Sequence, residues 1–377
     1  SLVGSEMCIR DSLSILTNIN NFNNENYSFG TNSLHQIDTV NGPGYQIAYE
    51  FDNNGAAKKI HHRKANGSSL RVLDYTRDAI GNITDKLDGS QNHTYDYDDN
   101  NQLTDSFNPI ANLSESFEYD NLGNRTSYNS QPYTYDSNSQ KLVDDGLYLY
   151  TYDNNGNLSS KQQKGFTGNY TNYIHDSQNR LIGIDTYAND ILIKEVDYIY
   201  DPLNRRVQKL VVDHNDNSKN IDLRYVYDGN EILQAFDVDN ELLATYTHST
   251  LRTDDPLGVV FTPKAVARGL IKSNGTYGYF KDHLGSITDL VSISGNIVQS
   301  YQYSAFGNLV SVKDSSGSDI SSDPVVKPMF TFTSREYDSE SGLMYYRARY
   351  YDSSIGRFLE IDPDPGIPTA PLSFNTK

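Results

Sequence analysis

Two aspartates toward the C-terminal end of the sequence have a spacing that suits acid–base chemistry. Asp352 and Asp362 are ten residues apart and flank Gly356-Arg357-Phe358, which can turn the chain so that the two carboxylates meet. Two adjacent carboxylates do not both ionise easily, so one keeps its proton as an acid while its partner acts as a base. Arg357 can hold one of them ionised. The structural alternative is that Asp362 belongs to an ordinary Asp-Pro turn and Arg357 only pairs with a carboxylate.

Metal ligands elsewhere in the sequence are poorly spaced. Residues 213–218 (Asp-His-Asn-Asp-Asn-Ser) are rich in oxygen ligands but lack the sixth-position glycine and the closing acidic residue of an EF-hand loop. His61 and His62 have no acidic or histidine partner at ligand spacing, so we expect them at the surface. We therefore predict neither a metal site nor a cofactor.

The first twelve residues are expected to be foreign to the protein. Back-translation of Leu2 to Asp11 resembles a sequencing adapter read as protein, and the segment lacks the cationic start and apolar core of a signal peptide. It contains the only cysteine, Cys8. Without it, disulfides, thiol catalysis and thiolate metal sites are excluded.

The elements that must position the aspartates are indicated by the composition. The 377 residues are 36% hydrophobic and carry a net charge of −18, values that taken alone favour disorder. The 30 tyrosines and 14 phenylalanines argue instead for a folded chain that uses tyrosine as its main apolar side chain. The acidity speaks against wrapping nucleic acid, and no apolar run approaches the roughly 18 residues of a membrane span.

One pattern recurs along most of the chain: aromatic–x–aromatic–Asp, followed by a short turn with Gly or Asn. In a strand, residues i and i+2 share a face, so both rings point to one side. The aspartate then ends the strand by accepting hydrogen bonds from turn N–H groups, and Gly or Asn allows the reversal. Successive aspartates are roughly 16 to 27 positions apart, about one β-hairpin. The repeat aspartates are Asp52, Asp78, Asp98, Asp120, Asp136, Asp153, Asp176, Asp201 and Asp228.

These repeats predict an all-β array of hairpins with one short turn of helix within Pro263 to Ile271. They resemble the YD repeats of rearrangement-hotspot (RHS) proteins, of the C component of insecticidal toxin complexes and of teneurins. The C-terminal part is similar to the RHS repeat-associated core domain, through elements like RDHLGS and ARYYD-x-x-x-GRF-x-x-x-DP. The matching residues, besides Asp352, Arg357 and Asp362, are Asp282, His283, Gly285, Arg349, Tyr350, Tyr351, Gly356, Phe358, Pro363 and Gly366.

The resemblance implies a curved or spiral β-sheet, part of a hollow β-shell, that ends in the core domain as a plug. We expect 13–44 to be an irregular upstream segment, 45–275 the hairpin array, 276–366 the core domain and 367–377 the start of a variable region. With only about nine repeats, the array is expected to be an open curved ribbon.

The family also implies a function: the shell holds a C-terminal toxin, and the core cuts the chain just after itself. That gives Asp352, Asp362 and Arg357 a role in self-cleavage, although residues 362–368 (Asp-Pro-Asp-Pro-Gly-Ile-Pro) depart from the usual Asp-Pro-x-Gly-Leu. The expected partners are the protein's own toxin and secretion-system or surface components, and the expected location is secreted or at a bacterial cell surface. Two alternatives stay open: a cell-surface adhesion protein that contacts glycans, and an autoprotease in its own right.

Overall fold

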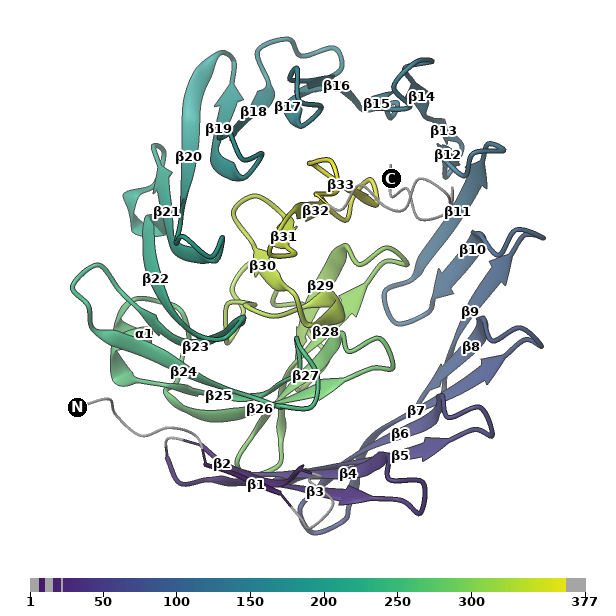
Figure 1. The fold of residues 1–377 in the computed structure, drawn as a ribbon, viewed down its shortest axis with the longest axis vertical. Coiled ribbons are helices and arrows are strands. Elements are labelled where there is room, and N and C mark those ends of the chain that lie inside the picture. The colour runs from purple at the N-terminus through teal and green to yellow at the C-terminus, as the bar shows by residue number, and fades with distance from the viewer. Residues whose placement is uncertain (1–6, 11–15, 22, 364–377) are drawn as a thin grey trace.

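The computed structural model describes residues 7–10, 16–21 and 23–363, which are built almost entirely from antiparallel strands joined in sequence order (Figure 1). The first sheet has thirteen strands. They are β1 (Met7–Arg10), β2 (Leu16–Asn20), β3 (Asn26–Thr31), β4 (Ile37–Gly42), β5 (Tyr45–Phe51), β6 (Ala57–Lys64), β7 (Ser69–Arg77), β8 (Ile83–Asp88), β9 (Gln91–Tyr97), β10 (Leu103–Asn108), β11 (Leu113–Tyr119), β12 (Arg125–Tyr128) and β13 (Gln131–Pro132).

The second sheet continues the same meander with sixteen strands. They are β14 (Thr134–Tyr135), β15 (Leu142–Asp144), β16 (Tyr148–Tyr152), β17 (Leu158–Gln163), β18 (Tyr170–His175), β19 (Leu181–Ala188), β20 (Ile191–Tyr200), β21 (Arg206–Asp213), β22 (Ile221–Asp228), β23 (Glu231–Phe236), β24 (Leu242–His248), β25 (Pro256–Phe261), β26 (Gly275–Lys281), β27 (Ile287–Ser292), β28 (Ile297–Tyr303) and β29 (Leu309–Asp314). We call these two sheets the wall.

A small third sheet lies inside the ring that the wall describes (Figure 1). It consists of β30 (Glu336–Asp338), β31 (Leu343–Tyr345), β32 (Tyr350–Asp352) and β33 (Arg357–Phe358), and we call residues 336–363 the plug. The helical elements are short: η1 (Asn217–Lys219), α1 (Pro263–Ala267) and η2 (Phe332–Ser334). In the part of the chain that the structure describes, no helix has the length and apolar character needed to cross a membrane.

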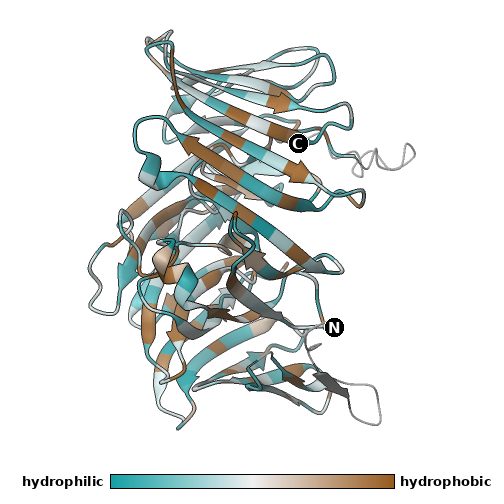
Figure 2. Cartoon of the chain, turned by 90° about the vertical axis from the view of Figure 1, so that its left-hand side faces the viewer, coloured by the Kyte–Doolittle hydropathy of each residue, from teal (hydrophilic) through white to brown (hydrophobic). Residues whose placement is uncertain are grey.

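The all-β class and the curved, spiral sheet predicted from the repeats are confirmed. The strands begin earlier than expected, because residues 16–44, expected to be irregular, contribute β2, β3 and β4 to the first sheet. The second sheet also runs across residue 275 without interruption, from β25 into β26. Polar and apolar residues are interspersed along many strands, as half-buried strands require (Figure 2), whereas β25–β27 are buried almost throughout.

The repeat aspartates close the hairpins. Asp120 ends β11, and its Oδ1 accepts hydrogen bonds from the backbone N–H groups of Leu122 (2.9 Å) and Asn124 (2.8 Å), while Gly123 has a φ of +75°. These bonds satisfy turn donors that have no partner in the ladder. The same i+2 and i+4 bonds are made at Asp52, Asp78, Asp98, Asp176, Asp201, Asp237, Asp282 and Asp314.

Some repeat aspartates vary the arrangement. Asp136 accepts from residues i+2 and i+3, and Asp153 accepts from Asn157 at i+4. Asp228 differs in kind, because it lies inside β22, pairs with Glu231 in the ladder and is exposed. The chain there reverses in a two-residue turn that needs no carboxylate.

The two aromatic rings of each repeat have different tasks. The first ring faces the core; Tyr75, Phe117, Tyr150 and Tyr198 are each 3% exposed. The second ring is half-buried, and its hydroxyl donates a hydrogen bond to a backbone carbonyl of the preceding hairpin, at the first residue of that hairpin's return strand. The pairs are Tyr97–Ile83, Tyr119–Leu103, Tyr135–Arg125, Tyr152–Leu142, Tyr200–Leu181, Tyr227–Arg206 and Tyr303–Ile287, with distances of 2.6–3.0 Å.

The coil is tight enough for the chain to overlap itself. Strands β25–β27 pack on the first sheet through a shared core that includes Tyr45 and Phe280, and the Tyr45 hydroxyl donates to the carbonyl of Leu257 (2.8 Å). A Cβ atom on Gly278 would lie 2.1 Å from the ring of Tyr45, so this contact requires glycine. The chain is thus less open than the curved ribbon we expected, because its later strands cover its first ones.

The overlap also overturns the expectation that His62 lies at the surface. His62 has no exposed area, and its ring stacks on Phe280 with 4.3 Å between centroids. Its Nε2 lies 3.1 Å from the carbonyl oxygen of Lys281, and burial lowers its pKa to about 4. A layer contributed by residues more than 200 positions away covers this strand, which local sequence does not reveal.

If the second-ring hydroxyls hold neighbouring hairpins in register, removing them should cost stability at each site. We expect Tyr119→Phe, Tyr152→Phe and Tyr227→Phe each to lower the free energy of unfolding by about 1 kcal/mol, and the triple variant by about 3 kcal/mol, because the sites are far apart. Urea unfolding followed by circular dichroism measures this. Tyr170→Phe is the matched control, since the Tyr170 hydroxyl makes no hydrogen bond within the described residues. Equal effects at Tyr119 and Tyr170 would contradict the role.

Candidate functional site

The plug is held against the inner side of the wall by a shared aromatic core. Its residues Leu343, Tyr345 and Tyr350 pack with the first rings of several wall repeats, among them Tyr150 and Tyr198. The Tyr198 and Tyr350 rings stack with 5.0 Å between centroids. The inward faces of the repeats therefore form the surface on which the plug folds.

A buried network of charges fastens the plug to β21. Arg206, with no exposed area, contacts Asp338 and lies 2.6 Å from Glu336, while Lys209 contacts Asp338 at 2.8 Å and Glu340 at 2.7 Å. Burial alone would raise the pKa of Asp338, but the two cations outweigh it and lower the pKa to about 2. Burying these charged groups costs desolvation free energy, and the charges are tolerated because each one contacts a partner of opposite sign.

Asp352 is buried and paired with a wall lysine. Its Oδ2 accepts a hydrogen bond from Lys161 Nζ at 3.0 Å, and its Oδ1 accepts from the backbone N–H of Ser354 at 2.9 Å. Burial raises the pKa of Asp352, but Lys161 and Ser354 outweigh it, and the pKa falls below its ordinary value. Asp352 is therefore an ionised carboxylate at neutral pH.

Asp362 has a different cation. Arg349 Nη2 lies 2.8 Å from its Oδ2, and the same guanidinium covers the ring of Phe358 at 3.8 Å. Arg357, which we expected to hold one of the aspartates, instead places its guanidinium over the ring of Tyr135 on the wall, 5.3 Å from the centroid. Arg349 and Lys161 thus fill the role that the sequence suggested for Arg357.

The structure therefore does not reproduce the carboxylate pair sharing one proton that we predicted from the spacing, because Asp352 and Asp362 are each bound to a separate cation.

A third acid, Glu360, has the raised pKa that we expected of the acid in that pair. Glu360 is 6% exposed, accepts a hydrogen bond from the backbone N–H of Tyr350 (2.8 Å) and lies 3.5 Å from His175. Burial raises its pKa above the ordinary value.

The remaining core-motif residues stabilise turns and layers. Asp282 caps its turn, Gly285 there has a φ of +83°, and the ring of His283 packs against Tyr75. Gly356, with a φ of +68°, leaves room for Arg125, whose Nη1 donates to the carbonyl of Ile355. Tyr351 donates to the carbonyl of Phe306, Pro363 is exposed, and Gly366 lies outside the described residues.

The calcium-like segment is an ordinary turn. Asp213 accepts hydrogen bonds from the backbone N–H groups of Asn215 and Asp216, and Asp216 caps η1. Among residues 7–10, 16–21 and 23–363, no three His, Cys, Asp or Glu side chains come together in a way that could hold a metal ion.

Sequence reasoning missed the contacts between wall and plug, but one signal was available. The first residue of a return strand is usually apolar, as at Leu103, Leu142 and Leu181, yet Arg125 and Arg206 occupy this position in two hairpins. Both arginines lie on the inner side of the wall and contact the plug. An arginine at the first position of a return strand thus marks a plug contact in these two hairpins.

The charge network yields a stability prediction. Asp338→Asn leaves Arg206 and Lys209 short of one anion, so we expect the free energy of unfolding at pH 7 to fall by about 3 kcal/mol. Because the folded pKa of Asp338 is about 2, its contribution is present above about pH 4 and is lost as the pH falls toward 2, where variant and wild type should converge. Urea unfolding across this range measures the difference. Asp99→Asn, at an exposed position, serves as the control. If Asp338→Asn lowered the free energy of unfolding no more than this control does, the network's role would be contradicted.

Several proteins of known name are similar to this chain in sequence. No family model matches the chain. The tRNA3(Ser)-specific nuclease WapA of Bacillus spizizenii is 28% identical over 304 residues, which is 78% of this chain and 10% of WapA. The probable deoxyribonuclease RhsA of Dickeya dadantii is 24% identical over 388 residues, covering 88% of this chain and 23% of RhsA.

Solved structures point the same way. The crystal structure of TcdB2-TccC3 matches with a TM-score of 0.57 at 15% identity, covering 95% of this chain and 21% of that one, so the two share the fold of a β-shell. This chain therefore spans between a tenth and a quarter of the length of the proteins to which it is similar. From the YD repeats, the core-domain signature, the coiled wall around its plug and these relatives, it follows that the chain is a member of the Rhs/YD-repeat protein family.

Proposed function

We propose that the chain forms a wall-and-plug section of a shell that encloses a toxin encoded C-terminal to it. The observation that carries the proposal is the position of the plug. Strand β33 and residues 359–361 lie inside the ring, where Leu158 of β17 donates a backbone hydrogen bond to the carbonyl of Leu359 (2.8 Å). A chain that continues past Pro363 therefore starts from the inner side of the wall.

The named activities of the relatives support a toxic cargo. WapA is a tRNA nuclease, and RhsA is named as a probable deoxyribonuclease. Because this chain spans only a small share of either protein, we infer that it supplies the enclosure and that any such activity belongs to another part of a longer protein. Secretion or display at a bacterial surface follows from this proposal. A surface protein that contacts glycans stays a prediction.

Enclosure is tested on the full-length protein by limited proteolysis. We expect the region C-terminal to the plug to resist protease while the wall is folded and to become sensitive in the Asp338→Asn variant, which weakens the plug's attachment. Mass spectrometry of the fragments over time measures this. A C-terminal region digested at once in the folded wild type would contradict enclosure.

We further propose self-cleavage on the C-terminal side of Pro363. A water molecule adds to the scissile carbonyl while an ionised carboxylate takes its proton, and a protonated acid gives a proton to the leaving amine, so that one peptide becomes a carboxylic acid and an amine. Asp362, which pairs with Arg349, suits the base, and Glu360, whose pKa burial raises, suits the acid. The hydrogen bond from Lys161 to Asp352 holds in position the turn that Asp352 begins.

Self-cleavage is tested on the chain extended by its native downstream sequence. We expect intact-mass spectrometry to find two fragments for wild type and for the exposed control Asp99→Asn, and a single chain for Asp362→Asn and Glu360→Gln. An uncut wild type would reject self-cleavage and leave the enclosure standing. A wild-type pattern in Asp362→Asn or Glu360→Gln would reject the assigned roles.

A further inference from the structure

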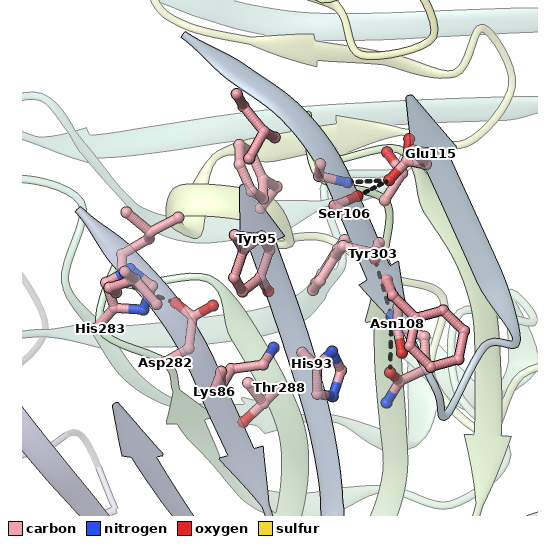
Figure 3. A pocket seen from close by; sticks show the side chains of 18 of the residues that line it. Lys86, His93, Tyr95, Ser106, Asn108, Glu115, Asp282, His283, Thr288 and Tyr303 are labelled. Atoms are coloured by element: carbon pink, nitrogen blue, oxygen red, sulfur yellow. Dashed lines mark hydrogen bonds between the residues drawn. The ribbon is translucent and has the colours of Figure 1, made fainter. Parts of the chain in front are cut away.

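A cavity of about 390 Å³ lies where the chain overlaps itself, and no residue of the plug lines it. Residues of β7–β11 in the first sheet line one side, and residues of β27, β28 and the turn between β26 and β27 line the other (Figure 3). Its size falls in the range of small-molecule sites, which commonly occur between layers. The rings of Tyr95 and Tyr303 line its middle.

Lys86 enters this cavity without a counterion. It lies directly opposite His93 in the β8–β9 ladder, so the two side chains share one face of the sheet. Within the described residues, Lys86 Nζ makes neither a hydrogen bond nor an ion pair. Burial lowers the pKa of Lys86, and the charges of Asp282 and Asp88 offset this effect only in part.

Two buried polar atoms beside Lys86 also lack partners. His93 is 1% exposed and Thr288 is 5% exposed, and His93 Nε2 and Thr288 Oγ1 have no hydrogen-bond partner in the described part of the chain. Burial lowers the pKa of His93 to about 3, so its imidazole is neutral at pH 7 and has one N–H to donate. Unsatisfied buried groups of this kind are uncommon and costly.

The acidic groups around the cavity are already engaged. Asp88 and Asp289 both pair with Arg71. Glu115 accepts hydrogen bonds from Ser106 and from the backbone of Ala305, and Asp282 caps its own turn. The side chains that remain free to bind a ligand can all donate hydrogen bonds. They are the ammonium of Lys86 on β8, the imidazole of His93 on β9 and the hydroxyl of Thr288 on the facing strand β27.

We propose that Lys86, His93 and Thr288 bind an oxyanion, either free inorganic phosphate or the carboxylate of a small molecule whose apolar part lies against Tyr95 and Tyr303. An anion beside Lys86 compensates a charge that burial otherwise penalises. The hydroxyl and the imidazole N–H supply further donors to its oxygens. The flanking rings offer apolar area for a group attached to a carboxylate.

Isothermal titration calorimetry of the whole chain at fixed ionic strength tests this with two probes, inorganic phosphate and benzoate. We expect at least one probe to saturate a single site. Lys86→Met should weaken its binding at least about tenfold, and Thr288→Val by about threefold, as loss of a charged and of a neutral donor predicts. The exposed Lys58→Met, on the same sheet, should bind as wild type does.

The two probes distinguish the sources of the oxyanion. Saturation by phosphate alone identifies free phosphate, and tighter binding of benzoate identifies a small carboxylate. Lys86→Met removes a poorly solvated charge and so should keep its fold, which the thermal melting curve checks, and Thr288→Val provides an independent second variant. Absence of binding by both probes, or equal binding by Lys86→Met and Lys58→Met, would overturn the proposal.

Discussion

A tyrosine hydroxyl that bonds back to the preceding hairpin fixes where each hairpin of the wall lies. A β-ladder alone allows neighbouring strands to slip in register, and a slip of one residue would turn every inward ring outward. At Tyr97, Tyr119, Tyr152 and Tyr227, among others, the phenol oxygen binds the first carbonyl of the previous return strand. The bond can form only when each hairpin stands in one position relative to the last.

That constraint explains why tyrosine, rather than phenylalanine, dominates the second position of the repeat. It also accounts for the informative exception at β18, where His175 replaces the second tyrosine. Its imidazole lies beside Glu360 of the plug instead of bonding to the previous hairpin. The wall therefore lacks one of these hydroxyl-to-carbonyl hydrogen bonds at the place where it contacts the segment that leads to Pro363.

The features that depend only on residues close together in the sequence, namely the strands, hairpins and turns, could be predicted. Ring pairs at i and i+2, an aspartate that ends each strand and a glycine or asparagine in the turn gave the all-β class, the hairpins and the turn role of residues such as Asp120. The pattern did not predict partners distant along the chain. His62 was expected at the surface but is buried. The residue that covers it, Phe280, is more than 200 positions away in the sequence, so local sequence could not reveal the contact. The spacing of Asp352 and Asp362 suggested that they share a proton, because Lys161 and Arg349 could not be assigned to them in advance.

The buried charges show why the plug has a defined seat. Apolar and aromatic contacts alone would hold a small sheet loosely in orientation, whereas Arg206 and Lys209 must meet Asp338, Glu336 and Glu340 in one arrangement or remain buried without partners. Repeats that are otherwise uniform acquire a specific inner surface through these few substitutions. The wall is thus both a container and a template for the sheet inside it.

Hydrogen-exchange mass spectrometry of the native protein can establish whether the plug folds inside the wall as part of one structure. We expect the backbone amides of β30–β32 to exchange as slowly as those of β19–β22, on which they pack, because exposing the plug requires opening the wall. Rapid exchange throughout β30–β32 beside a protected wall would contradict it.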